Sequence, residues 1–227
     1  DVLARVHRLL GDTVFFNTGT DEHGLKIFQA AEASHLSPQE YVDGYAEKFK
    51  QLTTLLNLSV THFVRTTDAH HIQAAQFFWN KCLENGDIYK KLYKVKYCVG
   101  CELEKTESEL VDGLCPLHPN KPIEIIEEEN YFFKFSAYQQ PLLELFSSHP
   151  DFVRPESKMK AIAAFVQHGL EDFSISRLKS KMPWGIEVPN DPDQVMYVWF
   201  DALINYISTL GWPENTTQFS SYWPGVQ

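Results

Sequence analysis

The sequence predicts an α/β fold in which a parallel sheet is interrupted by a smaller inserted module. Residues 1–85 alternate between extended and helical patterns, which favours a parallel sheet with crossover helices. After Gly86 the pattern changes to alternating strands around a cluster of cysteines and a histidine. Strand and helix patterns return near residue 172. The predicted units are therefore 1–85 and 172–227 of one α/β domain, with 86–171 as the insert.

The first unit contains four predicted helices. Apolar residues at helical spacing predict a helix over 2–10, and the strand after it lies within 13–24 and ends in a Gly-bearing turn. A helix over 25–33 follows. Ser37, Pro38 and Glu40 form a capping box that starts the next helix. The stripe of that helix predicted to be buried consists of Val42, Tyr45, Phe49, Leu52 and Leu56. An extended piece at 61–67 then precedes a helix over 68–85.

The insert is predicted to be antiparallel. Residues 87–98 and 129–136 alternate between apolar and polar side chains, and two helical stretches follow near 137–147 and 157–168. In the last unit, residues 194–211 are typical of a buried strand that runs into a helix, with Trp199 at the end of the strand.

Composition excludes several classes of function. The 227 residues are 44% hydrophobic, enough for one substantial core, but no apolar run approaches the roughly 20 residues that cross a bilayer. No leader is read in the first residues, so we expect a cytoplasmic protein without a membrane partner. The net charge of −10 argues against a surface that grips DNA. The basic run 89–96 is either a local RNA contact or a solvated face.

The cysteines form a metal-binding pattern. Cys98 and Cys101 make C-x2-C, and thirteen residues later Cys115 and His118 make C-x2-H. Two such pairs supply the four ligands of tetrahedral Zn²⁺, and because protein fills every position we expect a structural metal. Three cysteines and one histidine cannot form two disulfides, so the alternative is free thiols. Cys82 lies outside the pattern as a small buried thiol.

Four segments carry a resemblance to a known family. They are "TGTDEHG" (18–24), the cysteine segment, "DFSISR" (172–177) and "MYVWFDALINY" (196–206). In kind and order they resemble the methionyl-tRNA synthetases, which are class I aminoacyl-tRNA synthetases. The resemblance implies a Rossmann-like catalytic domain with an inserted zinc-binding connective domain, at the boundaries given above. It also implies an internal fragment without the HIGH and KMSKS segments, which we expect not to form methionyl adenylate alone.

The resemblance implies a methionine–tRNA ligase. Such an enzyme activates L-methionine with ATP and Mg²⁺ and transfers it to methionine tRNA, without a covalent protein nucleophile. It assigns Asp21 to the substrate ammonium, Arg177 to the carboxylates and Tyr206 to the thioether. The full pocket it implies is Asp21, His23, Gly24, Phe173, Arg177, Trp199, Ala202 and Tyr206.

Each of these residues also has a possible structural role that involves no substrate. Asp21 can be a turn aspartate, His23 a structural histidine, Arg177 a surface residue and the aromatic junction near Trp199 core packing. For the whole chain, the alternatives are another class I synthetase or a non-catalytic RNA-binding zinc-knuckle module. A pocket shared by Asp21, Trp199 and Tyr206 would separate the synthetase from the RNA-binding module.

Overall fold

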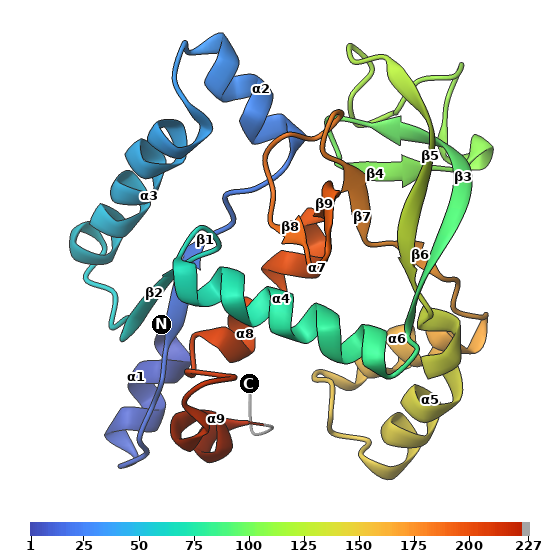
Figure 1. Ribbon diagram of the computed structural model, residues 1–227. Coiled ribbons are helices and arrows are strands. Elements are labelled where there is room, and N and C mark those ends of the chain that lie inside the picture. Colours follow the sequence, from blue (N-terminus) through green and yellow to red (C-terminus); the bar gives the residue numbers. More distant parts are fainter. Residues whose placement is uncertain (224–227) are drawn as a thin grey trace.

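The computed structural model describes residues 1–223, so the last four residues of the predicted third unit lie outside it. Figure 1 shows α4 running across the middle, with α3 at one edge and the β3–β5 ladder at the opposite one. The elements of the first unit are α1 (Val2–Leu9), β1 (Asn17–Thr20), α2 (Leu25–Ala33), α3 (Pro38–Leu55), β2 (His62–Arg65) and α4 (Ala69–Glu84).

Strands β1 and β2 form a parallel pair, with Asn17 opposite His62 and Thr20 opposite Arg65. Helices α2 and α3 make the crossover that a parallel connection requires. Within residues 1–223, parallel pairing is confined to these two strands. The α/β character is therefore present, whereas the parallel sheet is smaller than predicted.

Helix α3 begins as predicted but buries a different face. The Ser37 hydroxyl accepts from the backbone N–H of Glu40, whose carboxylate accepts from the N–H of Ser37, completing the capping box. Val42 is buried, together with Ala46. The rest of the predicted stripe is exposed, namely Tyr45, Phe49, Leu52 and Leu56. The stripe prediction was wrong because α3 packs against α2 and β1 with only Val42 and Ala46 buried, which leaves its long apolar side chains exposed.

The insert is antiparallel, as predicted. Its elements are β3 (Ile88–Cys98), β4 (Leu103–Lys105), the 3₁₀ turn η1 (Glu107–Glu109), β5 (Ile123–Phe133), the 3₁₀ turn η2 (Phe135–Tyr138), α5 (Gln139–Ser148) and α6 (Glu156–Gln167). Strands β3 and β5 pair along their whole length, from Ile88 opposite Phe133 to Cys98 opposite Ile123. The cysteine segment therefore lies at the far end of a long two-stranded ladder.

The last unit differs from the prediction. Its elements are β6 (Phe173–Ser174), β7 (Ser176–Leu178), β8 (Glu187–Val188), β9 (Asp191–Met196), α7 (Val198–Ala202), α8 (Asn205–Ser208) and α9 (Thr216–Tyr222). Strand β6 extends the sheet of the insert by pairing with β5, and β9 lies antiparallel between β7 and β8. Trp199 belongs to α7 rather than to the end of a strand. A fully buried apolar run does not reveal the direction of its neighbours, which explains the difference.

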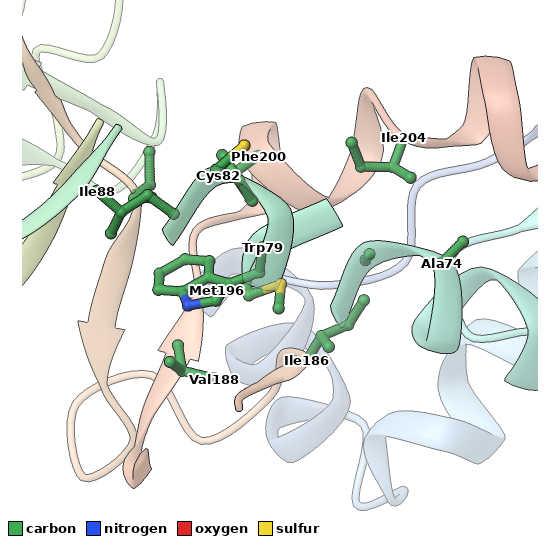
Figure 2. Packing of buried hydrophobic residues seen from close by; sticks show 11 residues of the cluster. Ala74, Trp79, Cys82, Ile88, Ile186, Val188, Met196, Phe200 and Ile204 are labelled. Atoms are coloured by element: carbon green, nitrogen blue, oxygen red, sulfur yellow. The ribbon is translucent and has the colours of Figure 1, made fainter. Parts of the chain in front are cut away.

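One core joins the first unit, the base of the insert and the last unit. Trp79 of α4 is fully buried and meets the rings of Tyr131 and Phe200 edge-on, at 5.2 and 5.3 Å between centroids. Figure 2 shows Trp79 among the apolar side chains of this cluster, which also includes Met196. Cys82 lies in the same core, and burial raises the pKa of its thiol to about 11. The Cys82 thiol therefore belongs to the packed core, as predicted.

Among the helices of residues 1–223, none combines the length and apolar character that a membrane span requires.

Candidate functional site

The loop after β1 is fixed by Glu22. Its carboxylate is buried and accepts from Arg65 Nε at 2.7 Å and Nη2 at 2.9 Å, as well as from the hydroxyls of Thr20 and Thr67. A buried carboxylate is stable only when its oxygens are satisfied in this way. Because Glu22 points inward, the neighbouring Asp21 points toward solvent, where it lines a pocket of about 850 Å³.

The loop is also clamped from the other side. The indole N–H of Trp184 donates to the carbonyl of Glu22 at 2.6 Å, and the N–H of Gly24 donates to the carbonyl of Trp184 at 3.1 Å. Gly24 has a φ of 113°, a region that side-chain-bearing residues rarely adopt. The predicted residue Gly24 thus shapes the loop, and it does not line the pocket in the described residues.

Asp21 combines an exposed side chain with crowded surroundings. The protein around it removes part of its solvation, and together with the charge of Asp201 this raises the pKa of the Asp21 carboxyl to about 7. The Glu102 carboxylate acts in the same direction, whereas His23 favours the ionised form. A carboxylate in such surroundings gains more free energy from pairing with a cation than a fully solvated carboxylate does.

Behind Asp21 lies a buried polar cluster. His23 Nδ1 is 3.1 Å from Oδ2 of Asp201, and His71 contacts the hydroxyl of Ser208 through Nδ1 at 3.0 Å. His71 Nε2 lies 4.0 Å from the other oxygen of Asp201. Burial raises the pKa of Asp201 and lowers the pKa of His71 to about 4. The predicted residue His23 is therefore 5% exposed and faces inward rather than toward the pocket.

Residues of the last unit complete the pocket. Ala202 and Tyr206 line it together with Asp21, which precedes them by more than 170 residues. The two do not share one continuous helix, because α7 ends at Ala202 and α8 begins at Asn205. Trp199 is 51% exposed and lies outside the pocket lining.

Arg177 is a core residue rather than a surface residue. It is 4% exposed in β7, and its guanidinium lies over the rings of Tyr197 at 4.5 Å and Tyr97 at 5.6 Å. Nη1 donates to the hydroxyl of Ser174 at 2.6 Å. The predicted approach of Arg177 to the substrate stays a prediction. Phe173 is 40% exposed and packs on Phe133 and Phe135, away from the pocket lining.

The four predicted metal ligands converge. Their ligand atoms, from Cys98, Cys101, Cys115 and His118, all lie within 4.8 Å of one another. Cys101 Sγ is 3.5 Å from Cys115 Sγ and 3.2 Å from His118 Nδ1. A tetrahedral zinc ion, with bonds of about 2.3 Å to sulfur and about 2.1 Å to nitrogen, needs ligands about 3.5 to 3.8 Å apart. The sulfur–sulfur distance lies in this range, and the sulfur–nitrogen distance is a few tenths of an ångström shorter, so small shifts would bring the four atoms to the spacing of a zinc site.

A glycine makes room for this cluster. A Cβ added at Gly100 would lie 2.4 Å from Cγ of His118 and 2.9 Å from its Nδ1. Such distances are clashes, so the turn between Cys98 and Cys101 can hold the histidine ring only when residue 100 has no side chain. The backbone is shaped around the ligand set, which supports a metal site rather than free thiols.

Carboxylates pair with three of the four lysines of the basic run 89–96. Lys94 pairs with Glu127 at 3.0 Å, and Lys96 pairs with Glu107 at 2.5 Å. At its start, Lys90 lies 2.7 Å from Asp191. These pairs, on facing strands and adjoining loops, leave little net positive potential for RNA. The solvated-face interpretation is the one the geometry favours.

The sequence matches a family model described as tRNA synthetases class I (M), over residues 1–121 and 100–227. The chain belongs to this family. It is 49% identical over 225 residues to a methionine–tRNA ligase of Caldanaerobacter subterraneus subsp. tengcongensis, and 45% identical over 228 residues to one of Thermotoga maritima. Each alignment covers 99% of this chain but only 35% and 36% of those relatives.

A solved class I tRNA synthetase (M) has the same fold. Mycobacterium tuberculosis methionyl-tRNA synthetase bound by methionyl-adenylate matches with a TM-score of 0.90 and 42% identity, over 98% of this chain and 44% of that one. The apo form of the same enzyme matches with a TM-score of 0.71 over 82% of this chain. This chain therefore spans less than half the length of these class I synthetases.

Sequence reasoning missed three residues that shape this candidate site. They are Glu22, which fixes the loop, Asp201, which holds His23, and Glu102, whose carboxylate reaches α2. For Asp201 a signal existed, because a single carboxylate inside the apolar run 195–204 must find a buried partner. Glu22 and Glu102 gave no comparable signal, since their partners lie 43 and 76 positions away.

Proposed function

We propose that this chain forms the amino-acid-binding part of a methionyl-tRNA synthetase. The complete protein activates L-methionine with ATP and Mg²⁺ in the cytoplasm and transfers it to methionine tRNA. The observation that carries the proposal is the pocket that Asp21 shares with Ala202 and Tyr206. An exposed carboxylate beside a small residue and an aromatic hydroxyl suits an amino acid with an ammonium group and an apolar side chain.

Each lining residue has a distinct role in the proposal. Asp21 receives the ammonium, and its crowding makes a cation a strongly favoured partner. Ala202 leaves room for the side chain of the substrate. The Tyr206 hydroxyl donates to the weakly accepting thioether sulfur. His23 and Gly24 shape the loop, while Trp199, Phe173 and Arg177 act from outside the present lining.

The metal has a structural role in this proposal. Cys98, Cys101, Cys115 and His118 hold Zn²⁺ with every coordination position filled by protein. When bound, the ion supplies folding free energy to a segment with few apolar contacts of its own. Residues 86–171 then form the connective domain, inserted between two halves (1–85 and 172–227) of a Rossmann-like catalytic domain to which the β1–β2 pair belongs.

Calorimetric titration of the complete protein with L-methionine tests the proposal. We expect binding, a loss of at least about tenfold in affinity with N-acetylmethionine, and a similar loss in Asp21→Asn, because each change removes one partner of the ion pair. Asp12→Asn is the matched control, since Asp12 lines the same pocket but pairs with His7 at 2.7 Å. Equal effects of the two variants would contradict the role of Asp21. RNA binding without methionine binding would favour the zinc-knuckle module instead.

A further inference from the structure

The cysteine segment and the substrate loop meet at the start of α2. Gly24 is the residue that precedes this helix, and having no side chain it leaves the first N–H groups without a local cap. The N–H of Lys26 donates instead to Oε1 of Glu102 at 3.2 Å, across 76 positions of sequence. A carboxylate at this place also favours the positive end of the helix dipole. Glu102 thus caps α2 from a distant segment.

A side chain at position 24 would have to displace the Glu102 carboxylate. A Cβ at Gly24 would lie 2.8 Å from Oε1 of Glu102. The carboxylate reaches the helix start because position 24 is a glycine. Two unusual features therefore meet at one point, a glycine with a φ of 113° and a distant carboxylate that occupies the space it leaves.

Glu102 is itself held on both sides. It directly follows Cys101, one of the four predicted metal ligands, and its backbone has a φ of 53° in the left-handed region. Its carbonyl accepts a hydrogen bond from the hydroxyl of Tyr197. Tyr197 in turn precedes α7, the helix that ends with Ala202. One residue therefore touches the elements that carry both halves of the pocket, the Asp21 loop and the start of α7.

We infer that Glu102 is a positioning residue for amino-acid binding, which couples the metal-bound segment to the loop that presents Asp21. This inference rests on the proposed function and deepens it. A bound metal would fix Cys101, which directly precedes Glu102, and Glu102 fixes the start of α2 at Leu25, four residues after Asp21. Glu102 touches no reacting atom. Its effect is expected on substrate binding more than on the chemical step.

Steady-state kinetics on the complete protein tests this role. Glu102→Ala should raise KM for methionine about tenfold, in line with the loss of a helix cap, and change kcat by less than about threefold. Glu102→Gln keeps an acceptor for the Lys26 N–H and should restore KM to within about threefold of the wild type. Glu107→Ala is the control, because Glu107 is an exposed acid of the same segment that pairs only at the surface with Lys96.

Amide hydrogen exchange gives a readout that does not require activity. Exchange at residues 25–28 should be about tenfold faster in Glu102→Ala than in Glu102→Gln or Glu107→Ala, with one metal per chain retained in all three. Unchanged exchange and KM in Glu102→Ala would overturn the inference, as would loss of the metal, since Glu102 would then serve the metal site itself. If the wild-type protein fails to bind methionine, the proposed function fails, while exchange still decides whether Glu102 fixes α2.

Discussion

His23 Nδ1 lies 3.1 Å from Oδ2 of Asp201, and the two side chains, 178 positions apart, are 5% and 0% exposed. The contact joins the loop after β1 to α7, which are the two elements that border the pocket from opposite ends of the sequence. Removing one partner of a hydrogen bond in such a buried, water-free position is costly, because the remaining partner stays buried and unsatisfied.

Asp201→Ala should therefore lower the free energy of unfolding by about 2 kcal/mol. The substitution leaves Nδ1 of His23 without its carboxylate and opens a small polar cavity beside His71. Urea denaturation followed by tryptophan fluorescence measures the change. Asp193→Ala, at an exposed position within β9, should cost less than about 0.5 kcal/mol, and equal costs for the two variants would show that the buried contact contributes nothing.

Arg65→Ala should be more damaging, at about 3 kcal/mol, because it strands the buried charge of Glu22. Arg65 also bonds Asp43 at 2.6 Å, but Asp43 is half exposed. Asp43→Ala removes only that outer partner and should cost about 0.5 kcal/mol. The difference between the two variants in free energy of unfolding, measured by chemical denaturation, reports the contribution of the Arg65–Glu22 pair. A difference near zero would contradict the prediction.

Asp21→Asn should stabilise the fold at the expense of the pocket. The pKa of Asp21 is about 7 in the folded state against 3.8 ordinarily, so the folded protein holds this proton more tightly than the unfolded chain. Stability contributed by Asp21 is thus present below about pH 4 and is lost as the pH rises toward 7. After allowance for solvent screening at this exposed side chain, the variant should gain about 1 kcal/mol at pH 8 and nothing at pH 4. Thermal melts of the wild type and the variant across this pH range measure the change. The same difference in melting temperature at every pH would contradict the prediction.

Gly100→Ala should weaken metal binding between about tenfold and a hundredfold, because the new methyl group collides with the ring of His118. Competition with a chromophoric zinc chelator measures the affinity. Gly113→Ala is the control in the same segment, since the space around Gly113 is open. That variant carries some backbone strain at its φ of 76° but should keep the affinity within about threefold. A similar loss in both variants would point to general loosening of the segment.

The features that could be predicted from sequence depend on neighbours in the chain. The capping box at Ser37 and the two cysteine pairs are complete within a few residues, so their spacing alone reveals them. The convergence of Asp21 and Tyr206 on one pocket was expected from the family resemblance rather than from spacing.

The features that could not be predicted depend on what packs against a residue. Phe49 repeats at helical spacing yet is exposed, because periodicity does not say whether a partner exists. Arg177 was expected near the substrate carboxylate, with a surface position as the alternative, whereas it is buried with its guanidinium over the rings of Tyr97 and Tyr197. The direction of β9 follows from its short connection to β8 and from its pairing with β7, which a buried apolar run does not encode.

The register of the β3–β5 ladder bears on how the cysteine segment can vary. The two strands stay paired without a shift through Cys98 and Ile123, so residues 99–122 form, in topological terms, an enlarged hairpin loop. Loop length has only a weak effect on the entropy of closing such a hairpin. A shorter turn, or a longer loop with a second metal site, could therefore replace this segment during evolution or engineering without altering the ladder below it. Such a replacement would remove the hydrogen bond between the Lys26 N–H and Glu102, so descendants without the segment would need another way to secure the first turn of α2.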